Sequence, residues 1–297
     1  MAGALRTTLE QIFLYHPAPH PIIKATSTII SIPWQYPIRA QLTYPFSTSN
    51  AQSLLEFTYR VSVHNRQISQ NNPNPIPLNP PQFDIAIPLN TTFMLRKINV
   101  GWVFYSTTLN IVVIAFTATY NDLLVLLDID YFQTAPSTMH NYRSGMLVHS
   151  GFWKLYHCIQ DNLLATLNQY VNANTQIATT GLSLGGAIST LAAFDLSSRT
   201  LPNGTTILNP IQYSFASPRV LNILAAQVYN QHILTSYRVV NGSDIIPTLP
   251  APIMPTMLGN EDFLHVETPC AFDKNLGNYY DNHITAYLDE YHILALP

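Results

Sequence analysis

The sequence predicts an α/β fold, in which a mostly parallel central sheet is flanked by helices. From about residue 86, runs of β-branched residues alternate with stretches whose apolar residues have helical spacing. These segments follow one another in the order strand, helix, strand, helix, strand, which is typical of parallel sheets. The chain has 297 residues, 47% of them hydrophobic, and it is therefore long enough to bury a large core around such a sheet.

Each predicted element has its own signal. An unbroken apolar run of strand length predicts a buried central strand at 111–116. Apolar residues at helical spacing predict a helix over 152–172, and a segment rich in Ala and Leu predicts another over 184–198. The other predicted elements are strands at 176–180, 212–216 and 237–240 and a final helix at 284–291.

The first 85 residues have a different character. Short apolar runs alternate with prolines, and residues 71–81 are dominated by Asn and Pro without any periodic pattern. Residues 53–63 are compatible with a helix or with a strand. We therefore expect residues 1–85 to be an N-terminal extension with a Pro/Asn-rich linker, packing on a main domain formed by residues 86–297.

The composition excludes several classes of function. Charged residues make up 10% of the chain, compared with about 25% in ordinary soluble domains, and the net charge is −3. The basic residues are scattered, so we expect no nucleic-acid partner. No apolar run approaches the roughly 20 residues of a transmembrane helix, and residues 1–15 lack the features of a secretory signal, so we expect a cytoplasmic location. Cys158 and Cys270 are expected to be free, buried thiols.

The pentapeptide Gly181-Leu182-Ser183-Leu184-Gly185 matches the nucleophile-elbow pattern Gly-x-Ser-x-Gly. A predicted strand precedes it and a predicted helix follows it, which is the context that the elbow requires. Ser183 is therefore the predicted nucleophile of an α/β-hydrolase. A turn serine without chemistry is the simpler alternative.

A serine hydroxyl needs a base and an orienting carboxylate, and in this fold the acid and then the histidine follow the serine. Asp244 follows the strand at 237–240, at the edge of the sheet where α/β active sites are built. His283 lies at the start of the final predicted helix, whereas His292 lies at its far end. Asp244 and His283 are therefore preferred, although a turn-capping aspartate and a surface histidine would give the same pattern.

Six ordered segments of the chain resemble the class 3 lipases, the fungal-type family that includes plant phospholipases A1, diacylglycerol lipases and feruloyl esterases. By this resemblance the catalytic triad is Ser183, Asp244 and His283. The residues that carry it are the strand 111–116 with Thr117-Ala118-Thr119, Val148-His149-Ser150-Gly151-Phe152, 181–187, 214–222, 238–250 and Asn282-His283-Ile284-Thr285-Ala286-Tyr287.

The resemblance also implies an oxyanion hole and a lid. The family usually has Arg-Gly-Ser/Thr after the central strand, and this chain has Thr117-Ala118-Thr119, so the oxyanion role falls on Thr119 together with the N–H of Leu184. Leu182 stands where the family usually has His. Residues 120–130, with five consecutive apolar residues, occupy the place of the lid, although an ordinary buried element is equally compatible. We expect structural roles for His149, Pro218 and Arg219.

The expected function is hydrolysis of carboxylic esters of lipids through an acyl-enzyme, as in a triacylglycerol lipase. A phospholipase A1 and a feruloyl-type esterase would have a similar sequence, and so would an inactive lipid-binding protein on the same fold. The expected partner is a lipid or another ester, with a membrane or droplet surface as its possible setting. No zinc or nucleotide motif is present, so no metal and no cofactor are expected. The sequence does not indicate an oligomeric state.

Overall fold

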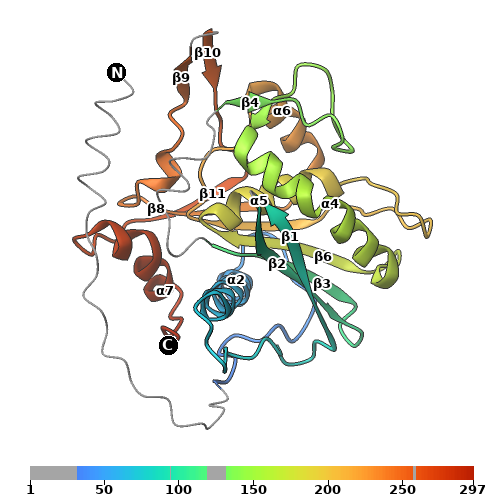
Figure 1. The fold of residues 1–297 in the computed structure, drawn as a ribbon, viewed down its shortest axis with the longest axis vertical. Coiled ribbons are helices and arrows are strands. Elements are labelled where there is room, and N and C mark those ends of the chain that lie inside the picture. The colour runs from blue at the N-terminus through green and yellow to red at the C-terminus, as the bar shows by residue number, and fades with distance from the viewer. Residues whose placement is uncertain (1–31, 94, 119–131, 257–258) are drawn as a thin grey trace.

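The centre of the molecule is a seven-stranded sheet in the order β1-β2-β3-β6-β7-β8-β11 (Figure 1). The computed structural model describes residues 32–93, 95–118, 132–256 and 259–297. Strands β3, β6, β7, β8 and β11 run parallel to one another, whereas β2 pairs antiparallel with both β3 and the edge strand β1. The predicted α/β fold with a mostly parallel sheet is therefore confirmed. The strands are β1 (Ile85–Phe93), β2 (Arg96–Ser106), β3 (Ile111–Phe116), β6 (Gln176–Leu182), β7 (Ile211–Phe215), β8 (Ser236–Asn241) and β11 (Thr268–Phe272).

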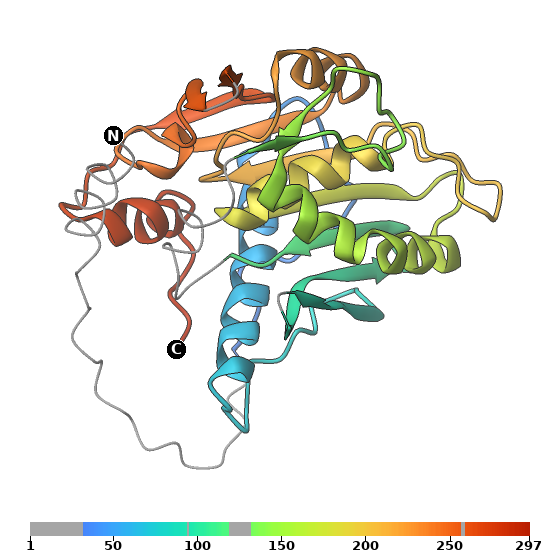
Figure 2. The ribbon, with the colours of Figure 1, turned by 45° about the horizontal axis from the view of Figure 1, so that its top comes forward.

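Helices cover both faces of this sheet, as Figures 1 and 2 show. On one face lie α4 (Ser150–Tyr170), α5 (Leu184–Leu196) and α6 (Ile223–His232). On the other lie α2 (Thr48–Ser69) and α7 (Ala286–Glu290). Alternate residues of β3 belong to the two resulting cores, and all six are buried. Burial on both faces explains why this strand is an unbroken apolar run rather than an alternating one.

Most of the predicted elements are present with small shifts of their ends. The strand 111–116 has the predicted bounds, and the strand predicted at 176–180 continues to residue 182. The final helix was predicted to begin at 284, but a π-helical turn (Asp281–Thr285) precedes α7, so His283 lies inside helical structure. Helical structure begins at Tyr279, and the side chain of the preceding Asn278 caps it, since Asn278 Oδ1 accepts the N–H of Asp281 at 3.0 Å.

Residues 53–63, which were compatible with two structures, belong to the helix α2. The helix buries Leu54, Phe57 and Val61 in the same core as Val113 of β3. It begins at the cap residue Ser47, whose side chain accepts the N–H of Asn50. The proposed division of the chain at residue 85 stays a prediction.

The segment after α7 is tied to α2 by hydrogen bonds. Gln52 Nε2 donates to the carbonyl oxygen of Tyr291 at 3.2 Å, and the N–H of Leu296 donates to Tyr59 Oη at 3.1 Å. These bonds therefore join the segment that follows His283 to α2.

Two short antiparallel pairs lie outside the main sheet. They are β4 (Gln133–Thr134) with β5 (Val148–His149), and β9 (Ile253–Thr256) with β10 (Gly259–Asp262). The predicted lid region, residues 120–130, lies outside the described residues.

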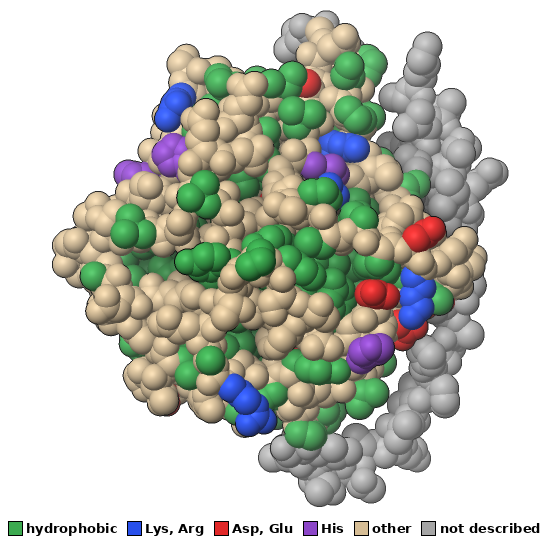
Figure 3. Space-filling model, turned by 180° about the vertical axis from the view of Figure 1, so that it is seen from behind, with side chains coloured by type: hydrophobic (Ala, Val, Ile, Leu, Met, Phe, Trp, Pro, Cys, Tyr) green, Lys and Arg blue, Asp and Glu red, His purple; other side chains and the backbone are tan. Residues whose placement is uncertain are grey.

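The surface carries few charges. Figure 3 shows hydrophobic side chains gathered over the hollowed middle of one face, with the charged side chains scattered around it. Among the described residues, no helix is long and apolar enough to cross a membrane. Both cysteines are free as predicted, but neither is fully buried. Cys158 is exposed, and Cys270 is half-buried at the margin of the core that contains α2.

Candidate active site

Ser183 occupies the sharp turn between β6 and α5. Its φ of +60° is a left-handed conformation that non-glycine residues rarely adopt, and its N–H donates to the carbonyl oxygen of Phe215 at 2.8 Å. The flanking glycines make the turn possible. A Cβ on Gly181 would lie 2.0 Å from the carbonyl carbon of Gly185, and a Cβ on Gly185 would lie 2.6 Å from the carbonyl oxygen of Phe116. The sequence pattern thus produces the strained elbow that the motif predicts.

The three predicted side chains meet above this elbow. His283 Nε2 lies 2.8 Å from Ser183 Oγ, and His283 Nδ1 lies 2.9 Å from Asp244 Oδ2. Ser183, Asp244 and His283 are 0%, 3% and 2% exposed, respectively. This geometry permits the imidazole to take the hydroxyl proton while the carboxylate holds the ring.

Two further donors hold the carboxylate of Asp244. Tyr287 donates its hydroxyl to Asp244 Oδ2 at 2.9 Å, and the N–H of Ile246 donates to Asp244 Oδ1 at 3.0 Å. Burial, followed by the negative charge of Asp244, raises the pKa of Tyr287 well above its usual value. The phenol therefore remains protonated and keeps donating to the carboxylate.

Asn241 connects the acid loop to the turn that carries the histidine. Its Nδ2 donates to the carbonyl oxygens of Lys274 and Asn282 at 2.9 and 3.0 Å, and its backbone carbonyl accepts the N–H of Asp244 at 3.0 Å. The backbone N–H of Asn241 donates in turn to Tyr287 Oη at 2.9 Å. One buried residue therefore fixes both the acid and the base.

Sequence reasoning missed Tyr287 and Asn241 as parts of this site. A signal for Tyr287 was present, since it follows His283 by four residues, a spacing that places two side chains on one face of a helix. Asn241 is the last residue of β8 and offered no comparable pattern, because its role depends on contacts with residues that are more than thirty positions away.

The structure describes only one of the two predicted oxyanion donors. Leu184 is the first residue of α5 and is buried, so its N–H lies at the N-terminal end of a helix, where negative charge is favoured. Thr119 lies outside the described residues. The segment before it, residues 117–118, is described and belongs to the wall of the neighbouring cavity.

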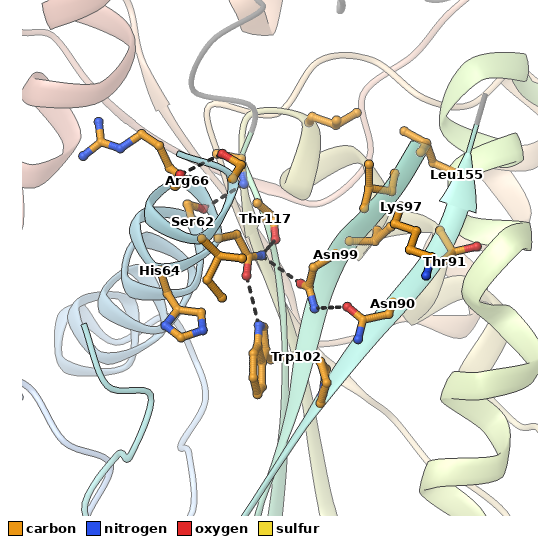
Figure 4. A pocket seen from close by; sticks show the side chains of 18 of the residues that line it. Ser62, His64, Arg66, Asn90, Thr91, Lys97, Asn99, Trp102, Thr117 and Leu155 are labelled. Atoms are coloured by element: carbon orange, nitrogen blue, oxygen red, sulfur yellow. Dashed lines mark hydrogen bonds between the residues drawn. The ribbon is translucent and has the colours of Figure 1, made fainter. Parts of the chain in front are cut away.

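A cavity of about 1070 Å³ borders the elbow (Figure 4). Leu184, Ile188 and Leu155 form part of its apolar wall, and Thr117 and Ala118 connect this wall to polar side chains of α2. The cavity therefore reaches both the start of α5 and the residues that follow β3.

The other family-matched residues have packing contacts. His149 is buried and stacks on Phe152 with ring centroids 3.9 Å apart. The guanidinium of Arg219 donates to the carbonyl oxygens of Thr248 and Pro250, which follow Asp244 in the chain. Pro218 is buried. Within the described residues, no cluster of three or more His, Cys, Asp or Glu could hold a metal ion.

The chain is similar to one known protein family and to several individual proteins. A family model described as "Lipase (class 3)" matches residues 113–254. A secreted mono- and diacylglycerol lipase A from Penicillium cyclopium is 30% identical over 152 residues, 50% of this chain and 46% of that protein. A chloroplastic phospholipase A(1) from Arabidopsis thaliana is 31% identical over 128 residues, 40% of this chain and 27% of that protein.

Solved structures share the fold. A Rhizomucor miehei lipase in complex with its propeptide has a TM-score of 0.56 and 22% identity, and the match covers 88% of this chain and 79% of that one. At this identity the likeness shows the fold alone. The chain spans about half the length of the curated relatives that it matches.

The expected cytoplasmic location is wrong. The relatives from Penicillium and Fusarium species are named as secreted lipases, which points to the outside of the cell. The expectation depended on the absence of a signal in residues 1–15, and such an absence does not determine where a protein is delivered.

Proposed function

We propose that this chain, which belongs to the class 3 lipase family, hydrolyses carboxylic esters of lipids with Ser183 as its nucleophile. The observation that carries the proposal is the continuous contact from Ser183 Oγ through the imidazole of His283 to Asp244, with distances of 2.8 and 2.9 Å. In these positions the three groups have the geometry of a nucleophile, a base and an orienting acid.

The reaction proceeds in two halves. Ser183 Oγ attacks the ester carbonyl while His283 Nε2 takes its proton, and the collapse of the tetrahedral intermediate releases the alcohol with that proton. Water then attacks the acyl-enzyme and gives its proton to His283. The second tetrahedral intermediate collapses, the carboxylic acid product leaves, and Ser183 Oγ regains a proton from His283. The N–H groups of Leu184 and Thr119 stabilise the oxyanion in both halves.

We propose glycerolipids at a lipid–water interface as the substrate class. The charge-poor composition and the apolar wall of the cavity support it. A phospholipase A1 activity is the second candidate, favoured by the relative from Arabidopsis thaliana. The third candidate, a feruloyl-type esterase, would differ from both because the acyl group of its substrate is aromatic.

We also propose that residues 86–297 form the catalytic domain and that residues 1–85 are an extension packed on it. The support is the burial of α2 against β3 and the hydrogen bond from Thr58 Oγ1 to the carbonyl oxygen of Phe116, at 2.6 Å.

A fluorophosphonate probe tests the nucleophile. The wild-type chain should be labelled at Ser183 and should hydrolyse a short soluble ester, and Ser183→Ala should lose both the label and about 10³-fold or more of the rate. Ser197→Ala is the matched control, because this buried serine lies at the far end of α5. A folded wild-type chain that is not labelled would contradict the proposal and would favour the inactive lipid-binding alternative.

The substrate class is tested by comparing four esters. Rates on a short soluble ester, an emulsified triacylglycerol, phospholipid vesicles and a feruloyl ester should be highest on the triacylglycerol emulsion. A preference for vesicles would establish the phospholipase alternative, and a preference for the feruloyl ester would establish the third.

A further inference from the structure

One face of α2 carries three polar side chains that meet the end of β3. Thr58, Ser62 and Asn65 are spaced four and three residues apart, so they form a row along the helix. The row contacts residues 116–118, which lead directly to the predicted oxyanion donor Thr119. The helix therefore touches the segment that connects β3 to this predicted donor in the sequence.

Two of these side chains bind the backbone of the segment. The hydroxyl of Thr58 donates to the carbonyl oxygen of Phe116 at 2.6 Å, and the N–H of Ala118 donates to Ser62 Oγ at 2.8 Å. Ser62 Oγ itself donates to the carbonyl oxygen of Thr58 at 2.7 Å, so its proton is engaged and a lone pair faces Ala118. Both hydroxyls are buried, and removing one would leave a buried backbone group without this bond.

Asn65 holds the side chain of Thr117. Its Nδ2 donates to Thr117 Oγ1 at 2.7 Å and to Asn99 Oδ1 at 2.8 Å, and its Oδ1 accepts the indole N–H of Trp102 at 3.3 Å. These three contacts use both ends of the amide and therefore fix its orientation. Figure 4 shows the network along the wall of the cavity between α2 and β2.

The elbow lies against the same segment. A Cβ on Gly185 would come within 2.6 Å of the carbonyl oxygen of Phe116 and 3.0 Å of that of Thr117. The segment is thus held by α2 and packed against the turn that presents Ser183 and Leu184. A small displacement of it would move Gly185 and, with it, the neighbouring N–H of Leu184, on which transition-state stabilisation in the proposed mechanism depends.

We propose that Ser62 and Asn65 are positioning residues of the oxyanion hole. They hold residues 116–118 against Gly185, and this packing keeps the neighbouring N–H of Leu184 in place at the start of α5. The inference rests on the proposed esterase function. Because the oxyanion exists only in the transition state and the intermediates, losing these side chains should lower kcat more than it changes substrate binding.

The experiment measures Ser62→Ala and Asn65→Leu on a soluble ester, with active sites counted by the burst of a chromogenic ester. Each variant should lower kcat by about tenfold, change KM by less than about twofold, and weaken inhibition by a boronic acid, which forms a tetrahedral adduct on Ser183, by about the factor lost in kcat. The pH midpoints of kcat/KM should not move, because the triad is unchanged.

Two controls separate positioning from stability. Ser197→Ala removes another buried serine hydroxyl, which donates to the carbonyl oxygen of His232 at 3.1 Å, and it should lower the melting temperature without lowering kcat per active site. Ser62→Thr keeps the hydroxyl and should recover most of the rate lost in Ser62→Ala.

Unchanged kcat and boronate inhibition per active site in both variants, with an active wild-type enzyme, would overturn the inference and leave the proposed function standing. A wild-type chain that neither hydrolyses the ester nor reacts with a fluorophosphonate would instead overturn the proposed function. If Ser62→Ala fails to fold, Asn65→Leu alone decides the inference, since Asn65 is only half-buried.

Discussion

The carboxylate of Asp244 is almost completely buried, a location that is costly for a charge unless several donors surround it. His283, the phenol of Tyr287 and the N–H of Ile246 supply these donors. Tyr287 also accepts the N–H of Asn241, so a single phenol links the acid to the end of β8. This phenol therefore holds in place the carboxylate that orients the base in the proposed mechanism.

Tyr287→Phe should therefore reduce catalysis without removing any triad member. We expect kcat/KM to fall by about tenfold, since one of the donors that fix a buried carboxylate is lost. Steady-state kinetics on a soluble ester provide the measurement. Tyr229→Phe is the matched control, because it removes the contact of another buried phenol with Ser236. Equal rates for Tyr287→Phe and wild type would contradict this role.

Among single residues, the sequence indicated those with a motif or a characteristic order, and it did not indicate the residues that hold them in place. Ser183 had a motif, and Asp244 and His283 had an order and a position relative to predicted elements. Asn241 had neither, because its contacts with Lys274 and Asn282 exist only after the chain has folded.

The elbow between β6 and α5 has no space for side chains larger than those of its glycines. The position of Gly181 leaves no room for a side chain, since even a Cβ would overlap the backbone of Gly185. The turn and the helix that follows it can therefore exist together only if the second-last residue of β6 is glycine.

Gly181→Ala should destabilise the fold by about 3 kcal/mol or more and abolish hydrolysis, because backbone must move to relieve the overlap. Urea unfolding and an ester assay measure the two effects. Gly204→Ala is the control: nothing lies near its Cβ, and its φ of +85° predicts a cost of only about 1 kcal/mol with full activity. Similar losses for the two variants would refute the steric explanation.

Elements with simple burial were predictable, and elements with mixed burial were not. The strand β3 is apolar on both faces, and its bounds followed from the sequence. In α2, charged and polar residues are buried among apolar ones: Glu56 pairs with Arg60 at 2.9 Å, and both are about 1% exposed. A helix that buries polar residues loses the amphipathic pattern by which a helix is distinguished from a strand.

On the scale of the whole molecule, one half-buried acid, Glu267, couples stability to pH. Glu267 accepts hydrogen bonds from Thr190 and Ser214 at 2.9 and 2.6 Å, which hold it near α5 and β7. Burial raises the pKa of Glu267 from 4.5 to about 7, and these two hydrogen bonds oppose the rise. Between these pH values the folded state binds more protons than the unfolded chain, so the free energy of unfolding falls as pH increases.

The contribution of Glu267 to stability should be fully present below pH 4.5 and lost as pH rises to about 7. Glu267→Gln should flatten this dependence by an amount on the order of 2 kcal/mol, after allowance for solvent at this partly exposed residue. Urea unfolding at pH 5 and pH 8 measures the difference for both proteins. Parallel pH dependences would show that Glu267 does not titrate in this range.

His283 belongs to a short helical unit at one face of the sheet, and the attachment of this unit to α2 includes the bonds from Gln52 to Tyr291 and from Leu296 to Tyr59. Such a unit can fray on warming while every strand of the sheet remains paired, because local opening needs less free energy than global unfolding. Turnover would then cease at a lower temperature than the one at which the sheet melts, and it would return on cooling. Moderate heating would therefore stop hydrolysis reversibly before it unfolds the sheet.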